Sequence, residues 1–148
     1  MEELISHVKP IDILLVEDNP GDVKLTREAL LETKVLTNLF TVENGVEALD
    51  FLYMRNDFKN AVRPDIILLD LNIPLKNGKE VLEIVKNDES LKRIPVVILT
   101  SSKAEEDIVR SYDLHANCYI TKPLDFFQFT QIVKAIEQFW FTIVKLPE

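Results

Sequence analysis

The stretch that decides the fold is Arg63-Pro64-Asp65-Ile66-Ile67-Leu68-Leu69-Asp70-Leu71-Asn72-Ile73-Pro74. Four consecutive aliphatic residues follow Asp65 and stop at the carboxylate of Asp70. A wholly apolar run of this length predicts a central strand buried on both faces, as is usual in parallel sheets. Because Pro74 cannot donate a ladder hydrogen bond, the chain must leave the sheet as a loop. Asp70 is therefore expected at the carboxyl end of a buried strand. There it either caps the next helix or takes part in the chemistry of a functional site.

Length, composition and charge indicate one globular domain without a nucleic-acid partner. The chain has 148 residues, 47% of them apolar and 28% charged, which suits a single domain with its own core. Its net charge of −8 argues against direct binding to nucleic acid, since neutralising phosphates requires clustered Lys and Arg. The lone cysteine, Cys118, suits a reducing compartment. With no basic leader and no run near the ~18 apolar residues of a membrane span, a cytoplasmic protein without a membrane partner is expected.

Short apolar runs alternate with segments of helical periodicity along the chain. The expected strands are Ile11–Val16, Leu39–Val42, Ile66–Leu69, Val96–Thr100 and Cys118–Thr121. Strict alternation of strands and helices predicts an α/β domain whose parallel sheet carries helices on both faces. With five strands, the expected arrangement is a flavodoxin-like (βα)5 doubly wound sheet with strand order 2-1-3-4-5. This order places the residues after Val16 beside those after Leu69.

The connecting helices carry start signals. Asn19-Pro20-Gly21-Asp22 combines a cap residue with a Pro in the first turn of a helix. Asn44-Gly45 and Asn77-Gly78 open two further helices, and the last helix is expected to begin near Asp125. In the helix after Asn44-Gly45, the apolar residues Val46, Leu49, Leu52 and Tyr53 are expected to lie on one face.

Polar side chains follow four of the predicted strands. They are Glu17 and Asp18 after the first strand, Asp70 after the third, Thr100 at the end of the fourth and Lys122 after the fifth. Neighbouring strands lie ~4.8 Å apart, so the three carboxylates should crowd together and repel one another unless a cation intervenes. Oxygen ligands without a nearby His or Cys suit Mg²⁺ (or Mn²⁺), and the backbone carbonyl of Asn72 is a further candidate ligand. The sequence therefore predicts a metal site to which a phosphate group binds later.

The same groups suit phosphoryl transfer to an aspartate. A carboxylate attacks in line while a metal ion and an ammonium group neutralise charge on the equatorial oxygens. Asp70 is the expected nucleophile, Thr100 can donate its hydroxyl to a phosphoryl oxygen, and Lys122 can pair with that oxygen as a point charge. Each residue alone has an ordinary structural explanation. Complementary groups from four strand ends at one edge of the sheet favour chemistry.

Four motifs of the chain resemble the receiver domain of two-component response regulators. They are Leu14-Leu15-Val16-Glu17-Asp18-Asn19, Leu68-Leu69-Asp70-Leu71-Asn72-Ile73-Pro74, Leu99-Thr100-Ser101 and Tyr119-Ile120-Thr121-Lys122-Pro123. The resemblance extends from Ile11 to Ile143. The expected organisation is an N-terminal extension over 1–10 and a single receiver domain over 11–148, which includes an extended C-terminal helix and tail.

The resemblance implies a role for each site residue. The phosphoacceptor would be Asp70, the metal ligands Glu17, Asp18, Asp70 and the backbone carbonyl of Asn72, the phosphoryl-stabilising residues Thr100 and Lys122, and the switch residues Thr100 and Tyr119. Glu17 departs from the Asp of many receivers, and its extra methylene favours a water-mediated metal contact. The implied chemistry is self-catalysed phosphorylation and dephosphorylation, so the protein is not expected to be an enzyme that turns over a free metabolite.

Further stretches resemble the small single-domain regulators that are paired with phytochrome histidine kinases. These are Lys92-Arg93-Ile94-Pro95-Val96-Val97, Ser111-Tyr112-Asp113-Leu114-His115-Ala116-Asn117-Cys118-Tyr119, and Phe139-Trp140 followed by Leu146-Pro147. This resemblance implies a photoreceptor sensor kinase as phosphodonor and a homodimer formed through the last helix. Since the sequence shows no DNA-binding or enzymatic domain, the output is expected to be a protein contact.

The last predicted helix carries an apolar stripe at helical spacing. The stripe consists of Phe129, Ile132, Val133, Ile136, Phe139, Trp140, Ile143 and Val144, and packing on the sheet explains most of it. Phe127 and Phe141 fall off the stripe by about 100° or more in a regular helix. The candidate patch for a dimer or partner is therefore Phe127, Phe139, Trp140 and Phe141.

Two rival functions remain open at this point. A phosphatase of the haloacid-dehalogenase type also uses an Asp after a strand together with Mg²⁺, but it requires an acid two residues later, where this chain has Asn72. A flavodoxin-like electron carrier needs a loop rich in Ser, Thr and Gly after the first strand. The acidic pair Glu17-Asp18 at that place would repel the flavin phosphate.

Overall fold

Five parallel strands form one sheet in the computed structural model, which describes residues 10–32, 36–101, 104, 118–122, 124–125 and 127–131. The described elements in chain order are β1 (Ile11–Val16), α2 (Pro20–Leu31), β2 (Thr37–Val42), α3 (Gly45–Leu52), the 3₁₀ helix η1 (Asn56–Phe58), β3 (Ile66–Asp70), α4 (Gly78–Asn87), β4 (Val96–Thr100) and β5 (Cys118–Thr121). The strand order is β2-β1-β3-β4-β5, and every neighbouring pair is parallel. The predicted flavodoxin-like sheet is confirmed.

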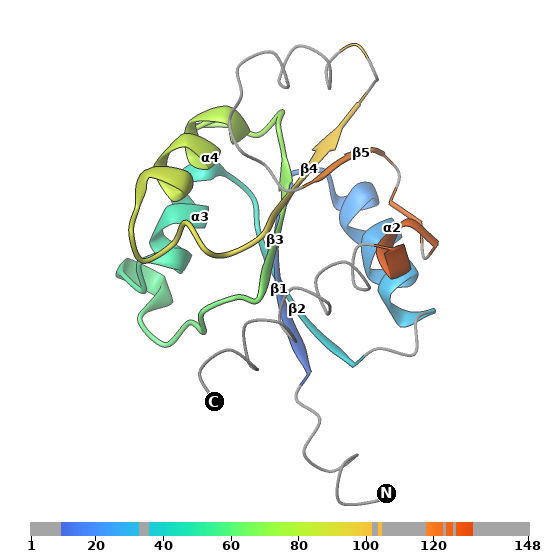
Figure 1. Cartoon of the computed structure of the whole chain (residues 1–148), viewed down its shortest axis with the longest axis horizontal. Helices are drawn as coiled ribbons and strands as arrows, with labels where there is room; N and C mark the ends of the chain where they lie inside the picture. The colour runs from blue at the N-terminus through green and yellow to red at the C-terminus, as the bar shows by residue number, and fades with distance from the viewer. Residues whose placement is uncertain are drawn as a thin grey trace, which may run out of the picture.

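The helices lie on both faces of the sheet. Figure 1 shows α3 and α4 on one side of the strands and α2 on the other, with the carboxyl ends of the strands towards the top of the view. The short helical segment at 127–131 lies on the same side as α2. This is the three-layer arrangement that right-handed crossovers between parallel strands produce.

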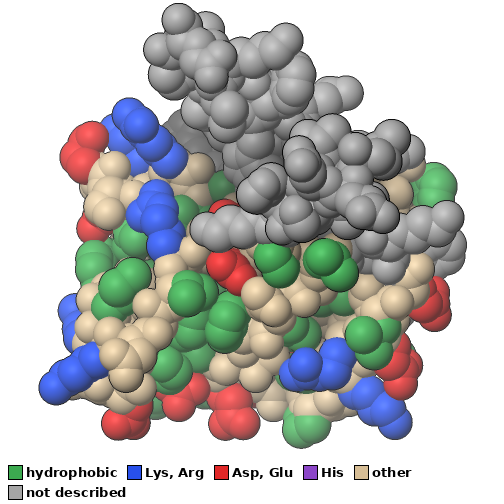
Figure 2. Space-filling model, turned by 90° about the horizontal axis from the view of Figure 1, so that it is seen from below, with side chains coloured by type: hydrophobic (Ala, Val, Ile, Leu, Met, Phe, Trp, Pro, Cys, Tyr) green, Lys and Arg blue, Asp and Glu red, His purple; other side chains and the backbone are tan. Residues whose placement is uncertain are grey.

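The described surface carries charges of both signs. Figure 2 views the molecule from below, and on that face blue Lys and Arg side chains and red Asp and Glu side chains lie among green apolar ones. Among the described residues, none of the helices combines the length and apolar character that crossing a bilayer requires. Together with the net charge of −8, the mixed surface gives the described part of this face no continuous basic patch for binding phosphates.

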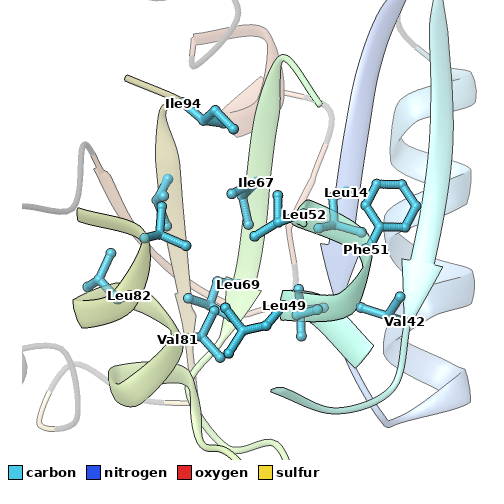
Figure 3. Packing of buried hydrophobic residues seen from close by; sticks show 14 of the residues in the cluster. Leu14, Val42, Leu49, Phe51, Leu52, Ile67, Leu69, Val81, Leu82 and Ile94 are labelled. Atoms are coloured by element: carbon cyan, nitrogen blue, oxygen red, sulfur yellow. The ribbon is translucent and has the colours of Figure 1, made fainter. Parts of the chain in front are cut away.

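Alternate residues of the buried strands supply two hydrophobic clusters. Leu14 and Ile67 face α3 and α4 in the larger cluster, which Figure 3 shows together with Val81 of α4. The smaller cluster lies on the opposite face and includes the fully buried Phe129. All five residues of β3 are buried. The expectation of a central strand that is buried on both faces is thus confirmed. Such a strand holds the residue at its carboxyl end in a fixed position.

The predicted start signals cap the helices. The Oδ1 of Asn19 accepts hydrogen bonds from the backbone N–H groups of Gly21 and Asp22, at 2.8 and 3.1 Å. Asn44 caps α3 in a similar way, and Asn77 forms a reciprocal capping box with Glu80 at the start of α4. At the start of the last helix, Asp125 and Gln128 exchange backbone-to-side-chain hydrogen bonds of 3.1 and 2.8 Å. These caps satisfy backbone donors that the first turn of a helix leaves free.

The apolar face predicted for α3 is buried only in part. Val46 is 41% exposed and Tyr53 is 38% exposed, whereas the buried residues of this helix are Gly45, Ala48, Leu49, Phe51 and Leu52. Phe51 turns inward because its ring packs between those of Phe40 and Phe58, with centroids 5.7 and 5.6 Å away. The hydroxyl of Tyr53 instead donates a hydrogen bond of 2.6 Å to Asp88, the C-terminal cap residue of α4.

Two glycines hold the loop between β3 and α4 close to the sheet. The N–H of Gly45 donates to the carbonyl of Pro74 at 3.3 Å, and a Cβ on Gly45 would lie only 1.9 Å from the carbonyl oxygen of Lys76. A Cβ on Gly78 would lie 2.5 Å from the carbonyl oxygen of Asp70. Real Cβ atoms do not approach backbone this closely, so only glycine fits at these two places. The loop that follows Asp70 is therefore fixed from both sides.

Candidate functional site

The carboxyl ends of four strands bring the candidate residues to one edge of the sheet, at the top of Figure 1. Glu17 directly follows β1, Asp70 ends β3 and Thr100 ends β4. Lys122 follows β5, and its backbone N–H donates to the carbonyl of Thr100 at 2.8 Å. The strand order 2-1-3-4-5 produces this meeting, since β1 and β4 are the two neighbours of β3.

Three carboxylates lie together at this edge. An oxygen of each of Glu17, Asp18 and Asp70 lies within 4.8 Å of one on each of the others. Glu17 and Asp70 are buried, at 2% and 1% exposed, while Asp18 is exposed. The crowding that the strand order predicted is present. Two buried carboxylates at this distance repel each other unless positive charge is placed between them.

Lys122 supplies positive charge to the cluster. Its Nζ donates hydrogen bonds to Glu17 Oε1 at 3.1 Å, to Asp70 Oδ2 at 2.9 Å and to Asp22 Oδ2 at 2.9 Å. Burial alone lowers the pKa of this ammonium group, but the hydrogen bonds to the three carboxylates outweigh burial and raise the pKa above its usual value. Lys122 is therefore a fixed cation at neutral pH.

Glu17 differs from an ordinary surface glutamate. Burial, followed by the neighbouring Asp70 carboxyl group, raises the pKa of Glu17 to about 7, and the hydrogen bond from Lys122 opposes this rise. Its Oε2 also accepts a hydrogen bond of 3.2 Å from the backbone N–H of Asn19. A second cation at the cluster would favour the ionised form further, because an opposite charge lowers a carboxyl pKa.

The remaining predicted residues surround the cluster. The N–H of Asn72 donates to Asp70 Oδ1 at 3.0 Å, and its side chain donates to the hydroxyl of Ser101 at 3.4 Å. The Oγ1 of Thr100, which is fully buried, donates to the carbonyl of Ile120 at 3.4 Å. Tyr119 is half-buried and packs against the larger hydrophobic cluster. The two loops beside Asp70 are thus tied together by Asn72.

Asp22 was missed as a site residue in the sequence, where it served only as part of a helix start. It lies in the first turn of α2, four residues after Asp18, and reaches Lys122. The available signal was its place in the first turn of α2, which begins directly after the loop that carries Glu17 and Asp18. A carboxylate in the first turn of a helix that starts at the end of a strand lies at the same edge of the sheet as that strand end.

Part of the prediction lies outside the described residues. The residues that the structure does not describe include Pro123 and the patch residues Phe139, Trp140 and Phe141. Phe127 is described and is 64% exposed, in agreement with its predicted position off the apolar stripe. The exposed fraction of one aromatic does not establish an interface.

The donor set fits a hard divalent cation. Carboxylate oxygens of Glu17, Asp18 and Asp70 converge within 4.8 Å, and the group contains no nitrogen or sulfur ligand. Such oxygen-only sets suit Mg²⁺ or Mn²⁺ better than zinc or copper. Asp18, the exposed member, lies on the solvent side, where a cation with several bound waters could approach.

Comparisons with known proteins agree on one family. Residues 13–136 match the response regulator receiver domain. The response regulator Rcp1 of Synechocystis sp. is 44% identical over 138 residues, which cover 93% of this chain and 94% of Rcp1. The probable methanogenesis regulatory protein FilR2 of Methanothrix harundinacea is 37% identical, over 88% of this chain and 84% of its own.

Solved structures of similar proteins include regulators of phytochromes. The phosphorylated cyanobacterial phytochrome response regulator RcpA is 51% identical with a TM-score of 0.73, over 91% of this chain and 96% of its own. The Mn²⁺-bound form of Rcp1 is 44% identical with a TM-score of 0.71, over 88% and 94% of the two chains. The bacteriophytochrome response regulator AtBRR is 41% identical with a TM-score of 0.81, over the same shares. On this agreement of sequence and fold, the chain belongs to the response regulator receiver domain family.

Proposed function

We propose that this protein is a response regulator that accepts a phosphoryl group on Asp70 from a sensor histidine kinase. The observation that carries the proposal is the setting of Asp70: a buried carboxylate at the end of the central strand, 2.9 Å from the ammonium of Lys122 and within 4.8 Å of two further carboxylates. An aspartate with a purely structural role does not require an ammonium group and two further carboxylates beside it. A nucleophile that will carry a phosphoryl group does, because the added charge must be neutralised.

In the proposed reaction, one Asp70 oxygen attacks the phosphorus of a phosphohistidine on the kinase. A P–O bond forms as the P–N bond to the histidine breaks, and the product is an acyl phosphate. Lys122 already donates to Asp70 Oδ2, so its ammonium lies where charge develops on the phosphoryl oxygens. A divalent ion held by Glu17, Asp18, Asp70 and the Asn72 carbonyl would supply further positive charge.

The conformational output is proposed to run through Thr100 and Tyr119. The hydroxyl of Thr100 makes a long hydrogen bond of 3.4 Å to a backbone carbonyl, and a phosphoryl oxygen can replace that carbonyl as the acceptor. Movement of this side chain frees space at the end of β4, towards which the half-buried Tyr119 of the neighbouring β5 can turn. The phosphate, with a charge near −2, thus biases one of two packings.

The proposed partner is a phytochrome-type histidine kinase, and the proposed setting is the cytoplasm. Similar proteins of known structure are phytochrome and bacteriophytochrome response regulators, which supports this choice. The single receiver domain is proposed to span 11–148, with signalling by protein contact rather than DNA binding. Self-catalysed phosphorylation and dephosphorylation are its only proposed chemistry, and the family match does not favour the phosphatase alternative.

Acetyl phosphate provides the direct test of this function. Incubation of the protein with acetyl phosphate and Mg²⁺ is expected to add a single phosphoryl group in intact-mass measurement, because Asp70 attacks the small donor in the same way. Chelation of the metal with EDTA should abolish the addition. An unlabelled protein in the presence of Mg²⁺ would refute the proposal. Transfer from an autophosphorylated phytochrome kinase, compared with a kinase of another class, tests the partner separately.

The homodimer is proposed to form through the patch Phe127, Phe139, Trp140 and Phe141. Replacing an interface aromatic by a small polar residue removes apolar burial, so Phe141→Ser should shift the protein towards monomer in light scattering. Leu31→Ser is a matched control, since Leu31 lies on α2 and is 78% exposed. It should leave the mass unchanged. If Phe141→Ser also leaves the mass unchanged, the patch is not the interface.

A further inference from the structure

Among the described residues, Lys122 has three carboxylate partners, and one of them lies outside the proposed metal site. Glu17 and Asp70 are both proposed metal ligands, whereas Asp22 is not among the carboxylates that converge for a metal. The distances do not separate them, since Lys122 lies 3.1 Å from Glu17 and 2.9 Å from each of the others. A metal ion and the ammonium group must therefore share two carboxylates, while Asp22 serves the ammonium alone.

The position of Asp22 is fixed by the start of α2. Its backbone N–H donates to the cap residue Asn19 at 3.1 Å, and it lies in the first turn, where the helix dipole favours negative charge. Its side chain is 29% exposed, whereas the side chains of Glu17 and Asp70 are buried. Asp22 can thus stay in place whether or not a cation occupies the buried carboxylates.

From this arrangement we propose that Asp22 is a positioning residue that holds Lys122 to one side of the metal site. Asp22 balances the single charge of Lys122, so the three converging carboxylates keep their negative charge for the metal ion. Without Asp22, the ammonium would rely on Glu17 and Asp70 alone and would compete more strongly with the metal for their oxygens. Asp22 would also keep Lys122 beside Asp70 when the metal has taken the shared carboxylates.

The inference rests on the proposed metal site and is tested by metal binding rather than by phosphorylation. Isothermal titration calorimetry with Mg²⁺ is expected to show about five-fold weaker binding in Asp22→Asn, a size typical of coupling between groups in direct contact. Asp22→Glu retains a carboxylate on the same turn and should restore binding to within about two-fold of the wild type. Glu28→Gln removes the same charge from an exposed position of α2 and should leave binding unchanged.

A double-mutant cycle separates competition by Lys122 from a simple loss of negative charge. In a Lys122→Met background, adding Asp22→Asn should change Mg²⁺ affinity by no more than about two-fold, because the competing ammonium is gone. An equal loss in both backgrounds, or no loss in Asp22→Asn alone, would overturn the inference. Failure of the wild type to bind Mg²⁺ at all would instead refute the proposed function, so the two failures are distinguishable.

Discussion

The Asp70→Asn variant is expected to remain entirely unphosphorylated by acetyl phosphate and Mg²⁺, with an intact mass equal to that of the untreated protein. An amide oxygen is a poor nucleophile, and the substitution also removes one of the three converging carboxylates. The shape of the side chain is preserved, so the N–H of Asn72, which donates to Oδ1, keeps an acceptor. The loss is thus expected to be chemical rather than structural.

Asp65→Asn is the matched control for this experiment. Asp65 directly precedes β3, at the opposite end from Asp70, and its Oδ2 accepts a hydrogen bond of 2.8 Å from the N–H of Asp12. This variant carries the same chemical change just before the same strand and should take up the phosphoryl group as the wild type does. A label that persists in Asp70→Asn would show that another residue is the phosphoacceptor.

A second large effect is expected for Gly45→Ala, this time on stability. The new Cβ would lie 1.9 Å from the carbonyl oxygen of Lys76 and 2.7 Å from its carbonyl carbon, so backbone must move. Such overpacking costs about 1–3 kcal/mol. The better helix propensity of Ala offsets about 0.5–1 kcal/mol of that cost. Urea unfolding should therefore show a free energy of unfolding about 1–2 kcal/mol lower than that of the wild type.

Gly21→Ala provides the comparison for that measurement. Gly21 lies in the first turn of α2, and a Cβ there would meet only the side-chain oxygen of Asn19, at 3.1 Å. A side chain can yield by a few tenths of an ångström where a backbone carbonyl cannot. The change in the free energy of unfolding should stay within about 0.5 kcal/mol. Equal losses in the two variants would show that the close approach at Gly45 is not the cause.

The sheet was predictable from the sequence wherever burial is complete. β3 and β4 lie inside the sheet, so Ile66–Leu69 and Val96–Thr100 read as unbroken buried strands. The edge strand β2 begins at Thr37, two residues before the expected Leu39. The strand opens with the polar residues Thr37 and Asn38, of which Asn38 is exposed, so its start does not stand out from a loop.

The face of a short helix was less predictable than its start. Caps are local, and a cap residue acts within one turn, so Asn44 and Asn77 marked α3 and α4 correctly. The burial of Phe51 depends on aromatic partners from β2 and η1, which no local pattern contains. Over the eight residues of α3, the periodicity admits more than one buried face, and packing decides between them.

Most residues of the candidate site could be predicted from the ends of the strands. The roles of these residues remain predictions. Glu17, Asp18, Asp70 and Lys122 were placed together because parallel strands end at one edge. Asp22 was not, because its contact with Lys122 depends on the direction of a helical side chain rather than on strand order. The hydrogen bond between Asn72 and Ser101 likewise joins two loops whose paths strand order does not determine.

The contacts of Lys122 join residues that are very distant along the chain. Its partners Asp70, Asp22 and Glu17 lie 52, 100 and 105 positions earlier. A nascent chain still lacking β5 would hold the acidic cluster without the lysine that is proposed to stabilise the acyl phosphate. The proposed phosphoacceptor site is thus complete only when β5 has joined the sheet, so under this proposal a phosphorylated molecule is also one whose synthesis and folding have reached that strand.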